Sequence, residues 1–285
     1  MSDTYKIIYK AKGKTFEISP DSPAKLLEGG LAGFDCTELD VKISPYATID
    51  GGYPVRRRFA ERELAVTFEI SREESASLRR KLISMLDPRE DGELIVDFFG
   101  DSRRITVIPC GEPKFDRHTL HSPTVVTLNF VAPTVFFSSG AKKTSTFRKT
   151  APLFTFPLTT TAVAGVTGGL KMTTDHTVAD NTGDTECGII VKVIATGGSV
   201  VNPTVSCGDD YIKTNLALAD GDVLVIDTRK GQKCITVNGE RCFSFMRDSA
   251  FFSLPLGQST IKVDADSGKE YINAQVEYVP LYYGV

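Results

Sequence analysis

The sequence contains no tryptophan and only three histidines among its 285 residues. Tryptophan faces commonly supply the surface on which sugar rings stack, so this absence weakens a carbohydrate-binding interpretation. No apolar run approaches the 18 or so residues of a membrane-spanning helix. The N-terminal segment MSDTYKIIYKAKGK has no apolar signal core. We therefore expect a protein that is made in the cytosol and spans no membrane.

Cysteines are few, and no two of them show CxxC spacing. At this length six cysteines are too few for a disulfide scaffold. We expect them to be small apolar residues in a reducing compartment. They are Cys36, Cys110, Cys187, Cys207, Cys234 and Cys242.

Charge is nearly balanced, and the net charge of −3 gives no sign of general nucleic-acid affinity. The two halves differ, however. Residues 1–150 carry 23 Lys and Arg against 21 Asp and Glu, whereas residues 151–285 carry 10 against 15. Residues 138–151, SSGAKKTSTFRKTA, are polar and basic without periodicity. We therefore predict a domain over 1–140, a linker over 141–151 and a second domain over 152–285.

One segment, SREESASLRRKLISML (71–86), predicts a helix. Ser71 and Glu74 have the spacing of a capping box. An apolar stripe follows at helical spacing, and Asp87-Pro88 ends the helix. The stripe consists of Leu78, Leu82, Met85 and Leu86. Alternating segments on both sides, LAVTFEI and ELIVDFF, predict a strand–helix–strand unit with the helix over a sheet.

The rest of the first half alternates with a period of two. Residues 4–18 predict an opening hairpin turned near Gly13, and Phe98–Val107 predicts a second one turned by Gly100-Asp101. Single strands are predicted for the segment FDCTELDVKIS and for Thr124–Val131. Residues 20–33 are rich in proline, glycine and small residues and predict a loop.

Asp50-Gly51-Gly52 is a strong turn signal between two polar segments, and it predicts a long protruding hairpin. Arg56, Arg57 and Arg58 lie on this hairpin. One interpretation is a solvated edge that discourages strand addition. The other, which makes these arginines the candidate assembly interface, is a contact surface for an acidic neighbour.

The second half consists of short strands between Gly, Asn and Asp turns, without a helical segment. Six or more strands at a spacing of 8–12 residues predict an antiparallel sandwich. Asn238-Gly239 predicts a type I′ turn. The clearest strands are CGIIVKVIA (187–195), DVLVIDT (222–228), KCITV (233–237), RCFSF (241–245), STIKVDA (259–265) and INAQVEYV (272–279).

The candidates for chemistry are weak. His118 and His121 lie three apart in a loop segment, and two further zinc ligands are missing. His176 follows Asp175 without any nucleophile signature. GVTGGL (165–170) has no lysine in the position that cradles a phosphate.

Two acidic segments have the residue types of a calcium loop or of a hydrolase site. Asp264, Asp266 and Gly268 resemble a calcium loop, but the glycine comes one position early and Gln275 stands where a glutamate belongs. A hairpin turn fits this segment better. Asp209-Asp210 is the one acidic doublet that suggests a hydrolase, yet adjacent strand residues point to opposite faces. We predict no catalytic, cofactor or metal site, and no enzyme.

A set of segments in a particular order runs through nearly the whole chain. The first half contains RRRFAERELAVTFEI, the helix ending KLISMLDP, GELIVDFFGDSRRITVIPCGEPKF and VTLNFVAPTVFF. The second contains NTGDTECGIIVKVIATGG, NPTV, DGDVLVIDTRKGQKCITVNGE, SAFFSLPLGQSTIKV and VEYVPLYYGV. In this order and spacing the segments resemble the distal tail protein (Dit) family of long-tailed phages with non-contractile tails.

The resemblance implies a mainly β (β-rich α+β) protein that forms a homohexameric ring at the tail end. Its first domain would build the ring and stack between the major tail-tube protein and the tail-tip protein. Its second domain would be a galectin-like β-sandwich that faces outward and holds receptor-binding or baseplate proteins. DNA would pass through the channel without specific binding. The location would be the virion, after synthesis in the host bacterial cytoplasm.

The chain departs from the family in two turns. Ala132-Pro133 stands where the family often has Asp-Pro, and Leu256-Gly257-Gln258 stands where Pro-Gly-Asn is usual. Both departures preserve a turn. The main alternative is a carbohydrate-binding β-sandwich module for adhesion to the host surface, with an exposed aromatic such as Tyr211 in its site.

Overall fold

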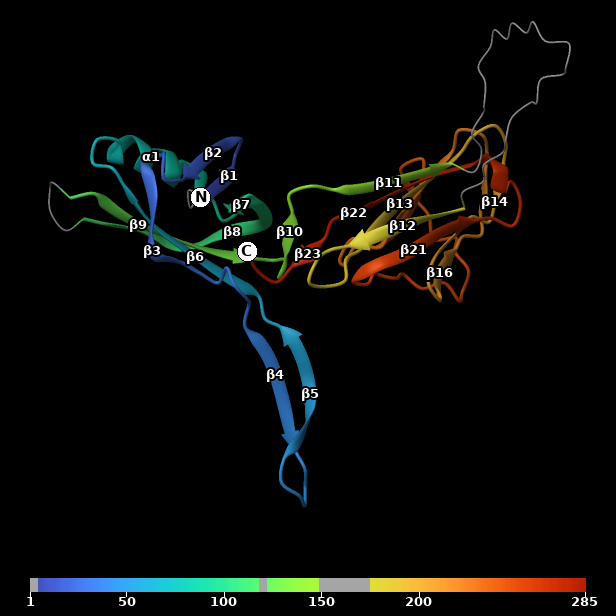
Figure 1. Ribbon diagram of the computed structural model, residues 1–285, viewed down its shortest axis with the longest axis horizontal. Coiled ribbons are helices and arrows are strands. Elements are labelled where there is room, and N and C mark those ends of the chain that lie inside the picture. The colour runs from blue at the N-terminus through green and yellow to red at the C-terminus, as the bar shows by residue number, and fades with distance from the viewer. Residues whose placement is uncertain (1–4, 118–121, 149–174) are drawn as a thin grey trace, which may run out of the picture. The chain divides into compact units, whose positions relative to one another are not determined.

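The computed structural model describes residues 5–117, 122–148 and 175–285 (Figure 1). The chain forms two compact units. Unit 1 comprises residues 1–140 together with 281–285, and unit 2 comprises residues 141–280. Antiparallel sheets dominate both units, and the described residues contain one α-helix. The predicted mainly β fold class is confirmed.

Unit 1 is built on one antiparallel sheet with the strand order β2-β1-β7-β8-β9-β6-β3; a short strand, β10, joins β8, and β23 joins β10. The last strand of the chain, β23, therefore belongs to unit 1. The strands are β1 (Tyr5–Ala11), β2 (Lys14–Ile18), β3 (Ala24–Ala32), β6 (Arg62–Ile70), β7 (Gly92–Phe98), β8 (Asp101–Asp116), β9 (Thr124–Ala132), β10 (Phe137–Ser139) and β23 (Leu281–Tyr282).

Helix α1 (Ser75–Met85) packs its apolar stripe on this sheet. Leu82 and Met85 are fully buried, and Leu78 and Leu86 are partly buried against the same core. The predicted strand–helix–strand unit is therefore confirmed as β6–α1–β7.

The predicted capping box is wrong. The helix begins one turn later, after Glu74, and no side chain caps it. The Ser75 hydroxyl instead lies 2.8 Å from the Thr124 hydroxyl, and Arg117 donates to Ser75 Oγ over 3.0 Å. A network anchored on the neighbouring strand β9 thus holds the first turn of the helix, in place of a local cap.

Most strand predictions for unit 1 are confirmed. Lys12 and Gly13 turn the opening hairpin, both with positive φ. The second hairpin turns at Phe99-Gly100, one residue earlier than the predicted Gly100-Asp101, because Asp101 already pairs with Phe98. The loop predicted over residues 20–33 is wrong, because β3 occupies most of it. β3 carries a bulge at its glycines, where a Cβ on Gly30 would lie 2.2 Å from the Thr67 carbonyl oxygen. The glycines serve this close approach within a strand rather than a loop.

Unit 2 is an antiparallel sandwich, as predicted. One sheet has the order β11-β22-β13-β18-β19-β20, and the other has the order β12-β21-β15-β16; β14 and β17 form a small pair. Tyr278 of the first sheet links to the second, since its hydroxyl accepts from the Asp180 amide and donates to the Asp180 carbonyl. The strands are β11 (Lys143–Arg148), β12 (His176–Asn181), β13 (Ile189–Ala195), β14 (Val200–Val201), β15 (Thr204–Cys207), β16 (Asp210–Lys213), β17 (Ala217–Leu218), β18 (Val223–Asp227), β19 (Cys234–Val237), β20 (Glu240–Arg241), β21 (Gly257–Asp264) and β22 (Ile272–Tyr278).

Three details of unit 2 differ from expectation. The segment predicted as a linker, 141–151, contains β11, which pairs along its whole length with β22. Of the strand predicted over 241–245, only the start is in strand β20. The predicted hairpin turn at 264–268 is wrong, because it joins β21 and β22, which lie in different sheets. Asn238 and Gly239 both have positive φ, which confirms the two-residue turn.

All six cysteines are free thiols. Burial raises the pKa of the Cys187 thiol to about 11, which keeps it protonated and unreactive at neutral pH. None of the helices in the described ranges has the length and apolar character that a bilayer crossing requires.

Candidate assembly surfaces

A two-stranded ribbon extends from the rest of unit 1 (Figure 1). It consists of β4 (Leu39–Pro45) and β5 (Gly52–Phe59), which pair with each other and with no other described strand. We call residues 39–59 the arm. The protruding hairpin predicted from the Asp50-Gly51-Gly52 turn is thus confirmed. An isolated two-stranded ribbon is marginally stable in water, so an arm of this kind is expected to gain order from a partner.

One face of the arm is polar and internally satisfied. Asp40 Oδ2 accepts from Arg56 Nη2 over 2.6 Å and from Arg58 Nε over 2.9 Å. The hydrogen bond from Arg58 lowers the pKa of the Asp40 carboxyl, and the charge of Arg56 acts in the same direction. This face therefore already contains the partners of two of its arginines.

The opposite face of the arm is apolar and bare. Leu39, Val41 and Ile43 alternate along β4 and are 61%, 53% and 63% exposed. Arg57 lies on this face, directly opposite Val41. Full burial of one such aliphatic side chain is worth about 1.5–3 kcal/mol. A partner that covers this face would therefore gain several kcal/mol.

The structure divides the arginines that the sequence presented as one set. Arg56 and Arg58 pair with Asp40, whereas Arg57 lies opposite Val41 and has no ion-pair partner among the described residues. This apolar face was not predicted from the sequence, although the alternation in LDVKI was its signal. Next to the turn, Val55 has no cross-strand partner, so the register shifts between Lys42 and Ile43.

Contacts of the buried Arg62 side chain connect the base of the arm to the rest of unit 1. Arg62, 1% exposed, donates from Nη1 to the Gly33 carbonyl oxygen over 2.9 Å and from Nη2 to the Tyr283 carbonyl oxygen. Its guanidinium lies 4.8 Å from the centroid of the Phe137 ring. Burial lowers the pKa of Arg62, although a guanidinium stays charged at any working pH. Arg62 thus connects the end of the arm to three other chain segments, those of Gly33, Phe137 and Tyr283.

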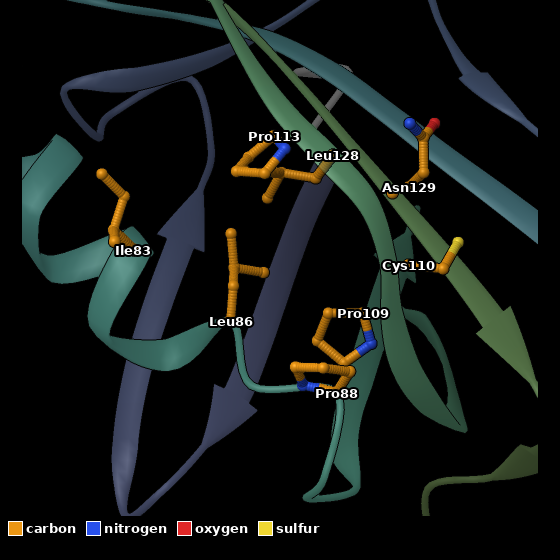
Figure 2. A pocket seen from close by; sticks show the side chains of 9 residues that line it. Ile83, Leu86, Pro88, Pro109, Cys110, Pro113, Leu128 and Asn129 are labelled. Atoms are coloured by element: carbon orange, nitrogen blue, oxygen red, sulfur yellow. The ribbon is translucent and has the colours of Figure 1, made fainter.

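A second surface feature of unit 1 is an apolar groove of about 450 Å³. It lies between the C-terminal turn of α1 and strand β8, where β8 has a bulge between Cys110 and Lys114 (Figure 2). Leu128 of β9 also lines it, and Ile83 on its helical side is 51% exposed. Its apolar lining consists mainly of Ile83, Leu86, Pro88, Pro109, Pro113 and Leu128.

His176 and the carboxylates of the calcium-like segment in unit 2 each contact an oppositely charged or hydrogen-bonding side chain. His176 Nδ1 lies 2.9 Å from Asp175 Oδ1, at the surface. Asp264 pairs with Lys269 over 2.7 Å, and Asp266 pairs with Lys213 over 2.6 Å. The carboxylates of the calcium-like segment therefore already have cationic partners.

The remaining candidates do not converge on a site. Asp210 begins the edge strand β16, Asp209 lies in the preceding turn, and both are exposed. Tyr211 is also on β16 and is partly exposed. Among the described residues, no group of three or more His, Cys, Asp or Glu side chains could hold a metal ion. His118, His121 and the segment 165–170 lie outside the described ranges.

Known proteins are similar to this chain in sequence and in fold. Residues 182–282 match the family described as siphovirus-type tail component, C-terminal domain (SPP1_Dit). The resemblance to the distal tail protein family is confirmed. No curated protein has a sequence that matches this one significantly.

Solved structures share the fold over almost the whole chain. The crystal structure of phage SPP1 Dit, titled a paradigm of the hub adsorption apparatus in phages that infect Gram-positive hosts, has a TM-score of 0.67 at 13% identity. The match covers 97% of this chain and 98% of that one. The phage P2 baseplate in its activated conformation with Ca gives a TM-score of 0.52 at 11% identity, and its form with Sr gives 0.53 at 10%; each covers 98% of both chains. The distal tail protein fold therefore extends through both units.

Proposed function

We propose that this protein is a structural, non-enzymatic hub of a phage tail tip or baseplate. Copies of the chain form a closed ring, most simply a homohexamer, that joins the tail tube to the tail-tip protein and to receptor-binding proteins. DNA passes through the ring without specific contacts. The protein is made in the host cytoplasm and resides in the virion.

The match to the Dit hub across 97% of the chain is the single observation that carries this proposal. The match of residues 182–282 to a siphovirus-type tail component supports it from the sequence side. The baseplate structures share the fold as well and point to the same kind of assembly.

The bare apolar face of the arm supports an assembly role independently of these likenesses. An exposed row of aliphatic residues on a protruding ribbon is an unfavourable surface for a monomer in water. A closed ring needs a head-to-tail contact between two different patches of the same chain. The arm supplies one such patch without help from any other molecule.

Light scattering coupled to size-exclusion chromatography, followed by negative-stain microscopy, tests the proposal on the purified full-length protein. We expect a mass that is a multiple of 31.0 kDa, six-fold for the hexamer, and ring-shaped particles. A strict monomer at every protein concentration would contradict the proposed ring.

A further inference from the structure

We propose that residues 281–285 form a strap that fixes both roots of the arm, and that unit 2, by folding, brings this strap into place. We call residues 33–38 the entry root and residues 60–62 the exit root. Every contact involved lies within one copy of the chain, so the strap does not depend on the proposed ring. A chain whose second unit is unfolded would then carry an arm without a fixed base.

The start of the strap is anchored on the sheet of unit 1. Leu281 and Tyr282 form β23 and pair with Ser138 and Phe137 of β10. The guanidinium of Arg103, on β8, lies over the Tyr282 ring at 3.6 Å from its centroid. The strap is therefore held by backbone pairing and by one cation–π contact before it reaches the roots of the arm.

The end of the strap contacts the entry root. The Val285 amide donates to the Phe34 carbonyl oxygen over 3.2 Å. Gly284 packs directly on backbone, because a Cβ at this position would overlap the Asp35 carbonyl oxygen and lie 2.9 Å from the Phe34 carbonyl oxygen. Backbone atoms cannot move aside as the end of a flexible side chain can. The strap therefore fits the entry root only with glycine at position 284.

The middle of the strap contacts the exit root. Arg62 donates through Nη2 to the Tyr283 carbonyl oxygen and through Nη1 to the Gly33 carbonyl oxygen, the latter over 2.9 Å. One buried guanidinium thus bridges the strap and both roots. The centroid of the Tyr283 ring lies 5.3 Å from that of Phe59, the last residue of β5, and 5.7 Å from that of Phe136. The same strap residue therefore contacts the arm itself through its ring.

The two roots also bond to each other. The Ala60 amide donates to the Glu38 carbonyl oxygen over 2.9 Å, and the Thr37 hydroxyl donates to the Ala60 carbonyl oxygen over 3.4 Å. The ribbon that continues from these residues pairs with no other described strand, so it cannot hold the roots in place. The Ala60 amide should therefore report whether the strap is seated.

The strap can open without the core of unit 1. Tyr283 and Val285 are partly exposed, and no strap residue is among the buried residues of that core. Tyr282 packs against the core from its edge. Segments with few buried apolar contacts open at a lower free energy than core strands do. Release of the strap should therefore loosen the roots and leave the sheet intact.

The fold of unit 2 decides how easily the strap closes. Only Val279 and Pro280 separate the end of β22 at Tyr278 from the start of β23 at Leu281. Within unit 2, Tyr278 pairs with Lys143 at the start of β11, so the folded unit keeps its two chain ends side by side. If unit 2 unfolds, the strap must close a loop that comprises the whole unit. The probability of closure falls roughly as the 3/2 power of loop length.

Gly284→Val tests the strap, by hydrogen–deuterium exchange of the full-length protein diluted below the concentration at which it assembles. Valine does not fit beside the Asp35 carbonyl group, so the strap should lift. We expect the Ala60 amide to exchange roughly tenfold faster or more, while amides of β7 change by less than about twofold. Val285→Ala is the matched control and should leave Ala60 unchanged, because it keeps the amide that bonds to Phe34.

Val191→Asp tests the role of unit 2. Val191 is fully buried on β13, so a charge there should unfold unit 2, seen as fast exchange of β13 and β22. We expect the Ala60 amide to accelerate about as much as in Gly284→Val, with β7 still slow. Combining both substitutions should add nothing at Ala60, because each removes the same contacts.

Three results would overturn parts of this mechanism. An Ala60 amide that stays slow in Gly284→Val would show that the roots hold without the strap. An Ala60 amide that stays slow while β13 and β22 exchange fast in Val191→Asp would show that unit 2 does not deliver the strap. Fast exchange of β7 together with Ala60 would contradict a strap that acts only on the roots. Light scattering decides ring formation separately, so failure of the ring and failure of the strap are distinguishable.

Discussion

Two antiparallel strand pairs of this chain have the same alternating pattern, yet they differ in what covers them. In unit 2, β13 and β22 turn Val191, Val193 and Val276 inward, all 0% exposed. In the arm, β4 turns Leu39, Val41 and Ile43 outward, all more than half exposed. Alternation therefore specifies that a face will be covered, and it does not specify whether the cover belongs to the same chain.

The difference has a consequence for mutation. A side chain that its own chain covers contributes to folding, and truncating it leaves a cavity. A side chain that only another molecule covers contributes to association. Substitutions in the core, at the base of the arm and at two paired carboxylates should therefore affect stability to different extents.

The largest effect is expected in the core of unit 1. Phe68→Ala should lower the free energy of unfolding by about 3–5 kcal/mol, because the ring is fully buried and packs 5.6 Å from the ring of Phe16. Val41→Ala should change it by less than about 0.5 kcal/mol. Urea denaturation followed by circular dichroism measures both, at the lowest usable protein concentration because assembly adds stability. Equal losses would erase the distinction between core and arm.

An intermediate effect is expected at the base of the arm. Arg62→Met should lower the free energy of unfolding by about 1.5–3 kcal/mol, because the carbonyl groups of Gly33 and Tyr283 lose a charged donor. Arg57→Met, on the exposed arm, is the matched control and should change the free energy of unfolding by less than about 0.5 kcal/mol. An Arg62→Met variant as stable as the unmodified protein would show that this base does not depend on the arginine.

The smallest effect concerns two carboxylates that each hold two cations. Asp87 accepts from Lys12 over 2.6 Å and from Arg89 over 2.9 Å, with a side chain that is nearly buried. The hydrogen bonds from Arg89 and then Lys12 hold the pKa of Asp87 far below its ordinary value. A lowered folded-state pKa means that the ionised group stabilises the fold at and above the unfolded pKa of about 3.9, and that this contribution is lost as the pH falls below it.

Asp87→Asn should therefore be destabilising at pH 7, and its difference from the unmodified protein should shrink steadily below about pH 4. Asp40→Asn in the arm should show the same sign with a smaller amplitude, since exposed ion pairs contribute little. Thermal unfolding of both variants across pH measures this. A difference for Asp87→Asn that grows on acidification would contradict the assigned linkage.

Local signals in the sequence predicted most elements but not their long-range partners. The turn at Asp50-Gly51-Gly52 and the stripe on α1 depend on neighbours in the chain, and both predictions are confirmed. Strand β3 was missed because its glycines look like a loop, although they form a bulge against Thr67. Strand β11 was missed because its residues are polar, and only pairing with β22 makes it a strand.

The candidate surface was predicted in part. The sequence located the arm and its arginines, but the three-residue run concealed two environments, because successive strand residues point to opposite faces. That Arg57 shares a face with Val41 follows only from the register of the hairpin. The groove could not be predicted, since it joins the end of α1 to a bulge in β8 more than twenty residues later.

Hydrogen–deuterium exchange of the arm in the assembled protein can decide what covers it. The claim is that a second molecule covers a ribbon that its own chain leaves bare. We predict that backbone amides of Leu39–Phe59 exchange slowly in the assembled full-length protein and rapidly in protein diluted below the concentration at which it assembles, while amides of β13 and β22 are equally slow in both. Rapid exchange of the arm within assembled rings would contradict the account.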